Sequence, residues 1–374
     1  MKVGFDARGI NLYNGTGIGT YAQNILKHIL NLDKENSYHI YWWGENYNDF
    51  SKENSKIVLT SKRRKSFYEE YYFPTNLNKE DVDLYHVPQN GMGLSKNTSC
   101  KKIITVHDLI PYTMPETVGK GYLKKFLRNM PQLVYDADAI ITVSEYSKKD
   151  ILRFFPMDEK KIFVTHLAAD GKYKPLDKYK CNNVLKNHYN IDTPFILYIG
   201  GFSPRKNIKS LLISFSKIYK NLDKDYKLVI VGANKKGTQI LMDIAKDLNI
   251  DSKIIFTGFV PEDHLPILYN SCETFVYPSL YEGFGLPPLE AMCCGTPVIT
   301  SNVTSIPEVV GNGGLLINPN NIDELSTSLE KTLVDTLFRK NLKKKALERA
   351  SIYSWENTAK NTLKVYNSIL SNNI

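Results

Sequence analysis

Residues 278–297, PSLYEGFGLPPLEAMCCGTP, predict a glycine-rich turn that joins an apolar strand to a short helix. Gly283 and Gly285 permit a tight backbone and the close approach of a ligand, while the prolines that follow suit a first helical turn. Gly295 is a suitable stop for the helix. Because the exposed N–H groups of a helix start attract anions, the stretch predicts a phosphate-binding turn at a strand end.

Two glutamates, Glu282 and Glu290, bracket this turn. A carboxylate beside a phosphate would repel it, whereas it accepts hydrogen bonds readily from hydroxyl groups. The pair therefore favours a sugar on each side of the phosphate. The alternative is an ordinary strand-to-helix turn in which Glu290 only complements the helix dipole.

Outward from this turn, short runs rich in Val and Ile alternate with amphipathic segments of helix length, a pattern typical of parallel sheets covered by helices. The fold class is therefore α/β, with two doubly wound sheets in tandem. Strands are expected at residues 2–6, 38–42, 56–59, 83–87, 102–106, 139–143, 162–165, 195–199, 228–231, 254–257, 274–277, 297–300 and 315–317. Helices are expected at residues 19–30, 145–155, 208–221, 238–248, 262–270 and 322–333.

The chain divides into two domains, as its 374 residues at about 150 per domain suggest. Residues 1–176 form the first domain, the polar and aperiodic stretch 177–192 is expected to be a linker, and residues 193–353 form the second domain. Ligands of such sheets bind beyond the carboxyl ends of the strands. Two facing sheets therefore predict a binding cleft between the domains.

Composition narrows the functional classes. With 42% hydrophobic and 23% charged residues, the chain is neither disordered nor a disulfide-stapled miniprotein. Its five cysteines lack metal-ligand spacing and are interpreted as reduced thiols of a cytoplasmic protein. The net charge of +9 suits phosphorylated ligands, an anionic membrane or nucleic acid, or simply aids solubility. No apolar run reaches the roughly 18 residues of a membrane span, and no signal peptide is expected.

The segment EGFGLPPLE at 282–290 resembles the motif of retaining glycosyltransferases of family four, in which seven residues separate two glutamates. The resemblance covers nearly the whole chain and includes several further segments in order: GTGIG at 15–19, VHDLIP at 106–111, VSE at 143–145, PRKN at 204–207 and SWE at 354–356. It implies a GT-B fold, in which two Rossmann-like domains face a deep cleft. It also implies that residues 354–374 form a helix, roughly 355–370, that packs back on the first, acceptor-side domain.

Arg205 and Lys206 follow the strand at 195–199 and precede a helix, which places two cations at the carboxyl edge of the second sheet. There they could clamp a diphosphate, although a solvated Arg-Lys pair is the ordinary alternative. Many relatives carry a further arginine where this chain has Gly201. Arg205 and Lys206 therefore remain as the cations for the phosphates.

The resemblance implies roles for other residues. His107 would contact the transferred sugar, although it could simply bond a loop backbone. Glu290 would hold the ribose, and Glu282 with the following backbone would hold the sugar hydroxyls. Donor-binding residues complete the set: Gly17 and Ile18 at the donor phosphates, Gly258, Phe259 and Val260 beside the nucleobase, and Gly283, Phe284, Gly285 and Leu286 in the turn.

Two basic stretches contain aromatic residues: 62–73, with KRRK at its start, and 120–128. Solvated helix faces are one interpretation. Because the resembled family binds acceptors in the first domain, peripheral contact with an anionic membrane that carries a lipid-linked acceptor is the other. Nucleic acid is not expected as a partner.

The sequence thus predicts a retaining, metal-independent enzyme that transfers a hexose from a nucleotide diphosphate sugar to a saccharide or lipid-linked acceptor. The donor most consistent with the resemblance is GDP-mannose, in the synthesis of a cell-surface polysaccharide or glycoconjugate. A UDP-hexose donor and a GT-B nucleotide-sugar epimerase are alternatives. A more distant one is a binding module for polysaccharide or nucleic acid, which would leave Glu282 and Glu290 without purpose.

Overall fold

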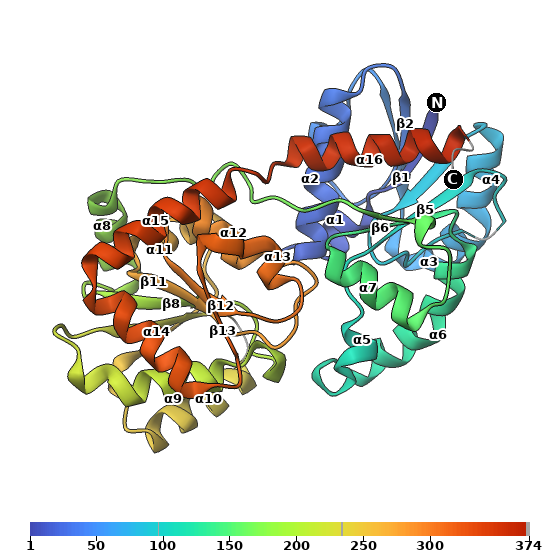
Figure 1. The fold of residues 1–374 in the computed structure, drawn as a ribbon. Helices are drawn as coiled ribbons and strands as arrows, with labels where there is room; N and C mark the ends of the chain where they lie inside the picture. Colours follow the sequence, from blue (N-terminus) through green and yellow to red (C-terminus); the bar gives the residue numbers. More distant parts are fainter. Residues whose placement is uncertain (96, 233–234, 372–374) are drawn as a thin grey trace. The chain divides into compact units, whose positions relative to one another are not determined.

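The computed structural model describes residues 1–95, 97–232 and 235–371. The chain forms two compact units, shown in Figure 1. The first contains Met1–Ala168 and the chain from Ser354 onward, and the second contains Ala169–Tyr353.

The first unit is built on a seven-stranded parallel sheet in the order β3-β2-β1-β4-β5-β6-β7. Its strands are β1 (Lys2–Asp6), β2 (Ser37–Trp43), β3 (Ser55–Thr60), β4 (Leu84–Val87), β5 (Lys101–Val106), β6 (Ala139–Thr142) and β7 (Ile162–Val164). Its longer helices are α2 (Gly17–Leu32), α4 (Phe73–Lys79), α6 (Lys120–Asp136), α7 (Glu145–Phe154) and α16 (Trp355–Leu370). The short helices α1 (Arg8–Leu12), α3 (Lys65–Phe67) and α5 (Ile110–Thr113) lie in the connections.

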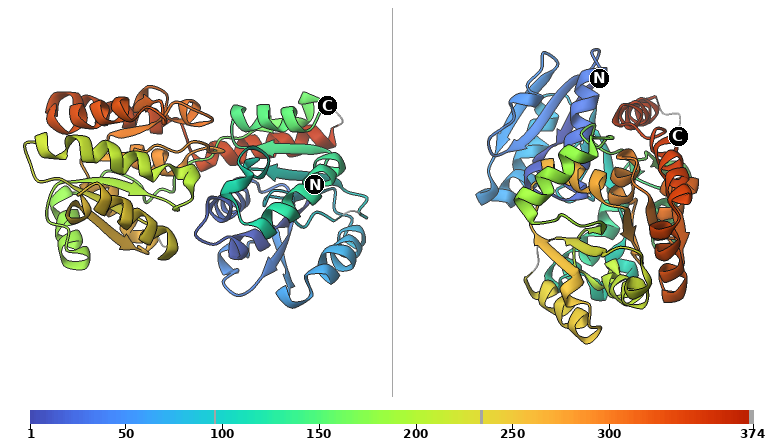
Figure 2. Two further views of the ribbon diagram at one scale, coloured as in Figure 1. Left: turned by 90° about the horizontal axis from the view of Figure 1, so that it is seen from below. Right: turned by 90° about the vertical axis from the view of Figure 1, so that its left-hand side faces the viewer.

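Both faces of this sheet are covered by helices (Figures 1 and 2). One core cluster joins alternate strand residues such as Tyr85 and Ile104 to Phe126 and Met130 of α6 and Ile151 of α7. Neighbouring strand residues point to opposite faces, and the central strands are buried almost throughout, as expected for a parallel sheet covered on both sides.

Helix α16 returns the end of the chain to the first unit, where it packs on α2. The hydroxyl of Tyr366 lies 2.6 Å from Nδ1 of His86 on β4, and Nε2 of the same ring lies 2.8 Å from the hydroxyl of Thr105 on β5. Burial lowers the pKa of His86 to about 3, so the ring is neutral. The expected return of the closing helix to the first domain is confirmed.

The second unit contains a six-stranded parallel sheet in the order β10-β9-β8-β11-β12-β13. Its strands are β8 (Phe195–Ile199), β9 (Lys227–Val231), β10 (Ile254–Gly258), β11 (Thr274–Tyr277), β12 (Val298–Ser301) and β13 (Leu315–Ile317). Its helices are α8 (Lys178–Tyr189), α9 (Ile208–Ile218), α10 (Lys235–Asp247), α11 (Leu265–Ser271), α12 (Leu286–Cys293), α13 (Ile306–Val310), α14 (Ile322–Val334) and α15 (Thr336–Ala350). The two doubly wound sheets are those predicted.

The expected linker at 177–192 needs correction, because it contains α8 and belongs to the second unit. Asp177 caps the helix by accepting a hydrogen bond from the N–H of Lys180, and Cys181 and Leu185 are buried where α8 packs on α11. Two buried side chains in twelve residues produce too weak an apolar periodicity to be noticed. The N-terminal segment of the first unit ends at Ala168, before the boundary expected at residue 176.

Within the described ranges, none of the helices offers an 18-residue window apolar enough for a bilayer crossing.

Replacing Tyr366 with phenylalanine should destabilise the first unit. The change removes the partner of a buried imidazole nitrogen, which costs about 1–3 kcal/mol. The thermal unfolding midpoint of Tyr366→Phe should fall, while that of Lys364→Ala, which changes an exposed residue of the same helix, should not. Equal midpoints for Tyr366→Phe and the parent would show that this bond contributes nothing to the docking of α16.

Candidate functional site

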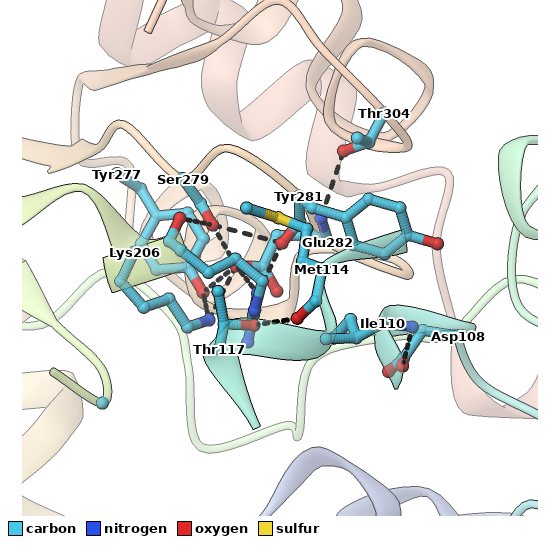
Figure 3. Close-up of polar contacts among 12 residues, drawn as sticks. Asp108, Ile110, Met114, Thr117, Lys206, Tyr277, Ser279, Tyr281, Glu282 and Thr304 are labelled. Carbon is cyan, nitrogen blue, oxygen red and sulfur yellow. Dashed lines mark hydrogen bonds and ion pairs between the residues drawn. The ribbon is translucent and has the colours of Figure 1, made fainter. Parts of the chain in front are cut away.

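One carboxylate oxygen gathers four donors in the second unit (Figure 3). Oε1 of Glu282 accepts hydrogen bonds from Nη1 of Arg205 at 2.9 Å and from Nζ of Lys206 at 2.7 Å. It also accepts from the hydroxyls of Tyr277 at 3.0 Å and Ser279 at 2.5 Å. These five residues, the Glu282 cluster, hold two cations and one anion together.

The sheet topology explains why the members of the Glu282 cluster meet. Arg205 and Lys206 follow β8, Glu282 follows β11, and these two strands are hydrogen-bonded neighbours. The strand order reverses between them, since β9 lies on the other side of β8. Such a switch point, at the carboxyl ends of the strands, is where open α/β sheets bind their ligands.

The backbone locks the two loops to each other. The N–H of Leu280 donates to the carbonyl of Arg205 at 2.8 Å, and the hydroxyl of Ser279 also reaches that carbonyl at 3.3 Å. The Arg205 guanidinium bonds the carbonyl of Tyr281. Because both side chains and backbone are fixed before any ligand arrives, the cations are held in one geometry.

Burial and charge act in opposite directions on Glu282, whose side chain is 12% exposed. Burial disfavours its ionised form, but Lys206 and Arg205 outweigh it and hold the pKa of this carboxyl at about 2. Glu282 is therefore ionised at neutral pH. The ammonium of Lys206 also lies 4.8 Å from the ring centre of Tyr277, a favourable cation–π contact.

The turn that follows is shaped by Gly285, with a φ of +118°. A Cβ at this position would lie 2.7 Å from Cδ1 of Ile306, so a larger residue would be both strained and crowded. The hydroxyl of Ser305 donates to the carbonyls of Glu282 and Phe284 and fixes the turn from behind. Helix α12 then begins at Leu286, with the expected glycine turn at its start.

Glu290 lies apart from the Glu282 cluster, on α12. Its Oε2 accepts a hydrogen bond from the hydroxyl of Tyr269 at 3.0 Å. Burial raises the pKa of Glu290 to about 7, so the group changes its charge near neutral pH. The two glutamates thus differ in character, whereas the sequence suggested that both serve mainly to accept hydroxyl hydrogen bonds. The structure shows that Oε1 of Glu282 is bonded to two cations, which the sequence did not predict.

Gly258 ends β10 with a φ of +70°, and its carbonyl accepts a hydrogen bond from the N–H of Gly232 at 3.2 Å. The side chain of Phe259 is 76% exposed, while that of Val260 is buried. Phe259 is thus an aromatic surface at the carboxyl end of the second sheet, on the β10 side.

His107 of the first unit follows β5 and is buried. Its Nε2 lies 2.8 Å from the carbonyl of Pro88, which can only accept, so Nε2 carries the proton. Burial lowers the pKa of His107 to about 4, and the ring is neutral at physiological pH. The backbone bond that was the alternative for His107 is therefore present, and it leaves Nδ1 as the acceptor atom of the ring.

Gly17 and Ile18 form the start of α2, where Thr16 is the cap and accepts a hydrogen bond from the N–H of Gly19. The first N–H groups of a helix have no acceptor within it. Gly17 is exposed and Ile18 is half-buried, so their N–H groups are placed to meet an anion.

A second charged network, in the first unit, was missed from the sequence. Arg8 donates from Nε and Nη2 to the two carboxylate oxygens of Asp6, at 2.8 and 2.7 Å, and from Nη1 to Glu69 at 3.0 Å. Gln89 donates to Asp6 at 2.7 Å. The network lies beyond β1 and β4, the switch point of the first sheet. The position of Asp6 as the last residue of a buried strand was the available signal.

The acid sensitivity of the protein should depend on Glu282. A pKa of about 2 in the folded state, against 4.5 for an ordinary glutamate, contributes about 3 kcal/mol of stability at neutral pH. That contribution is present above pH 4.5 and is lost as the pH falls toward 2. The stability gap between the parent and Glu282→Gln in urea unfolding should therefore narrow from pH 6 to pH 3. Glu330→Gln, a change on an exposed helix face, is the control; a gap that does not depend on pH would contradict the assignment.

Comparisons with known proteins identify the family of this chain. Residues 16–170 match glycosyltransferase family 4, and residues 184–349 match the family of glycosyl transferases group 1. O-antigen chain mannosyltransferase B of Escherichia coli is 31% identical over 382 residues, covering 98% of this chain and 99% of that protein.

Two solved structures share the fold at low sequence identity. Sucrose-phosphate synthase from Thermosynechococcus elongatus superposes over 100% of both chains with a TM-score of 0.78 and 19% identity. Anabaena HepE, solved in complex with UDP and glucose, covers 98% of this chain and is itself covered fully, with a TM-score of 0.78 and 16% identity. The chain therefore has the GT-B fold and belongs to the family 4 glycosyltransferases, enzymes that transfer hexoses.

Proposed function

We propose that this glycosyltransferase transfers mannose from GDP-mannose, with retention of configuration, to a saccharide or lipid-linked acceptor during synthesis of a cell-surface polysaccharide. The observation that carries the proposal is the Glu282 cluster, which fixes two cations at the switch point of the second sheet. The choice of mannose is supported by the similarity along almost the whole chain to an O-antigen mannosyltransferase.

In the proposed reaction the bond between the anomeric carbon and the β-phosphate oxygen breaks. The acceptor oxygen bonds that carbon, and its hydroxyl proton passes to an oxygen of the departing diphosphate. Negative charge grows on the departing diphosphate. Arg205 and Lys206 would stabilise that charge, and because Glu282 already orients them, little reorganisation is needed as the bond breaks. The helix start after Gly285 would add its N–H groups.

The other residues would position the donor. The Glu290 carboxylate would accept hydrogen bonds from the ribose hydroxyls, and the backbone at Gly283 and Phe284 would meet the sugar. Phe259 is placed to border the base. In the first unit, Nε2–H of neutral His107 is bonded to the carbonyl of Pro88, so Nδ1 is the acceptor atom of the ring. Nδ1 would accept a hydrogen bond from a sugar hydroxyl.

We also propose that transfer proceeds without a divalent metal, since Arg205 and Lys206 would neutralise the diphosphate. Full activity after exhaustive chelation would support this, and activity that returns only when Mg²⁺ or Mn²⁺ is restored would contradict it.

A UDP-hexose is the second donor to consider, because HepE, a protein of the same fold, binds UDP in its crystal structure. A nucleotide-sugar epimerase would use the same donor site but need no acceptor. Incubation of the protein with several nucleotide sugars separates these functions. Release of the nucleotide supports transfer, whereas an isomerised donor supports epimerisation.

Peripheral contact with an anionic membrane remains a proposal for the basic aromatic stretches. Phe67 and Tyr71 are 49% and 64% exposed, and Tyr122 and Leu127 of α6 are also exposed. Such side chains among lysines and arginines suit the interface of an anionic bilayer. The fraction of protein that floats with liposomes should therefore rise with their content of anionic lipid. An equal fraction with neutral and anionic liposomes would contradict this contact.

The donor base can be identified by thermal shift with GDP, UDP and ADP. A ligand that binds only the folded state raises the melting temperature, by roughly 5 °C at a hundredfold excess over its Kd. GDP should give the largest rise. A larger rise with UDP would replace GDP-mannose by a UDP-hexose as the proposed donor.

Two substitutions should separate binding from turnover. Lys206→Ala should lower kcat by about a hundredfold, because it removes stabilisation of the departing charge. Glu290→Ala should instead weaken nucleotide affinity by about tenfold, since it removes hydrogen bonds to a charged acceptor. Steady-state kinetics and calorimetric titration measure the two effects, and normal turnover by Lys206→Ala would refute the role of that lysine.

The charge change of Glu290 should make donor binding depend on pH. With a pKa of about 7, the carboxylate form that accepts ribose hydroxyls gains population as the pH rises from 6 to 8. Nucleotide affinity of the parent should therefore increase over this range relative to Glu290→Gln, which retains an acceptor but cannot titrate. The Gln variant also corrects for the titration of the nucleotide itself. Parallel pH profiles would show that Glu290 does not contact the nucleotide.

A further inference from the structure

The first unit contains a cavity of about 580 Å³ that none of the residues assigned above to donor binding or catalysis lines. Its walls come from the segment 65–70, the loop that contains Gly93, and one face of α6. Among the residues that the structure describes, three cations line it, Lys65, Lys125 and Arg128, against two carboxylates, Glu69 and Glu70. The side chains of Asn129 and Gln132 also line it.

The wall between this cavity and the sheet is fixed by Glu69. Arg8 donates to Oε1 of Glu69 at 3.0 Å, and Nζ of Lys65 lies 3.5 Å from the same oxygen. Arg8 is itself buried and paired with Asp6. Glu69 is therefore ion-paired on two sides, so its charge opposes an incoming anion less than an unpaired carboxylate would.

Gly93 lies in this wall at a position where a side chain would not fit. Its φ is +111°, and a Cβ there would lie 2.5 Å from Nη2 of Arg8 and 3.0 Å from Oε1 of Glu69. Residues 68–72 add a π-helical turn, a feature often found at functional sites. The cavity is thus bounded by a backbone that a larger residue could not adopt without strain.

The cations of the cavity repel one another. Lys125 and Arg128 lie three residues apart on α6, and the charge of Lys65 is the main cause that lowers the pKa of Lys125 from its ordinary value. Glu69 offsets this repulsion only in part. An anion between the three side chains would remove it, and a phosphate would take charge-assisted hydrogen bonds from each of them.

We propose that this cavity binds a phosphate or diphosphate group through Lys65, Lys125 and Arg128, and that the group belongs to the acceptor. The link to the acceptor rests on the proposed transfer reaction, whereas the anion site itself does not. The phosphate could be carried by a soluble phosphorylated saccharide or by the headgroup of a lipid-linked one. Asn129 and Gln132 would then donate hydrogen bonds to the neighbouring oxygens.

Titration of the full chain with inorganic pyrophosphate, at saturating concentration of the best-binding nucleoside diphosphate, tests the site by calorimetry. The nucleotide occupies the donor site, so that any remaining heat reports a second site. Lys125→Glu should weaken this binding by about tenfold or more. Lys124→Glu makes the same charge change one residue away, outside the cavity, and should alter the affinity by no more than about twofold. An unchanged nucleotide-induced thermal shift in both variants shows that they are folded.

Two further ligands distinguish the sources of the phosphate. If a hexose 1-phosphate binds the parent and Lys124→Glu but not Lys125→Glu, the acceptor is a soluble phosphorylated saccharide. The same pattern with phosphatidylcholine vesicles that contain polyprenyl phosphate indicates a lipid-linked one. The proposal is overturned if pyrophosphate binds only in the absence of nucleotide, or if both variants lose binding equally. If the protein binds pyrophosphate at this second site but transfers no sugar, the anion site is supported and the proposed function is rejected.

Discussion

The ionised carboxylate of Glu282 is the constraint on which the account of this enzyme depends. Two cations placed side by side at a strand edge would repel each other and move apart into solvent. Bonded to one oxygen of Glu282, at 2.9 and 2.7 Å, Arg205 and Lys206 stay together and keep their positive charge at the sheet edge. A positive site that is organised before the substrate arrives stabilises developing charge better than one that must rearrange.

Topology brings this arrangement about. The two segments are more than seventy residues apart in the chain, but β8 and β11 are adjacent at the point where the strand order reverses. The first sheet has its own reversal between β1 and β4, and there the structure again places a buried ion pair, Arg8 with Asp6. In each unit, therefore, the carboxyl ends of the central strands carry the charged groups, and helices cover the faces (Figure 1).

Much of the fold could be predicted from the sequence because strands buried on both faces are continuous apolar runs, and each expected strand occurs in the structure. Helices α8 and α15 were not predicted, because few of their residues are buried and their apolar pattern is weak. The pairing of Glu282 with Arg205 and Lys206, and of Arg8 with Glu69, could not be predicted, because each joins residues that are far apart in the chain. Motif spacing singled out the candidate side chains, but it could not predict that Glu282 bonds the two cations.

The position of a bound diphosphate tests the central claim most directly. A crystal structure of the protein with its nucleoside diphosphate should show β-phosphate oxygens about 3 Å from the side-chain nitrogens of Arg205 and Lys206, with both still bonded to Glu282. A diphosphate bound elsewhere, or one that reaches neither cation, would contradict the account.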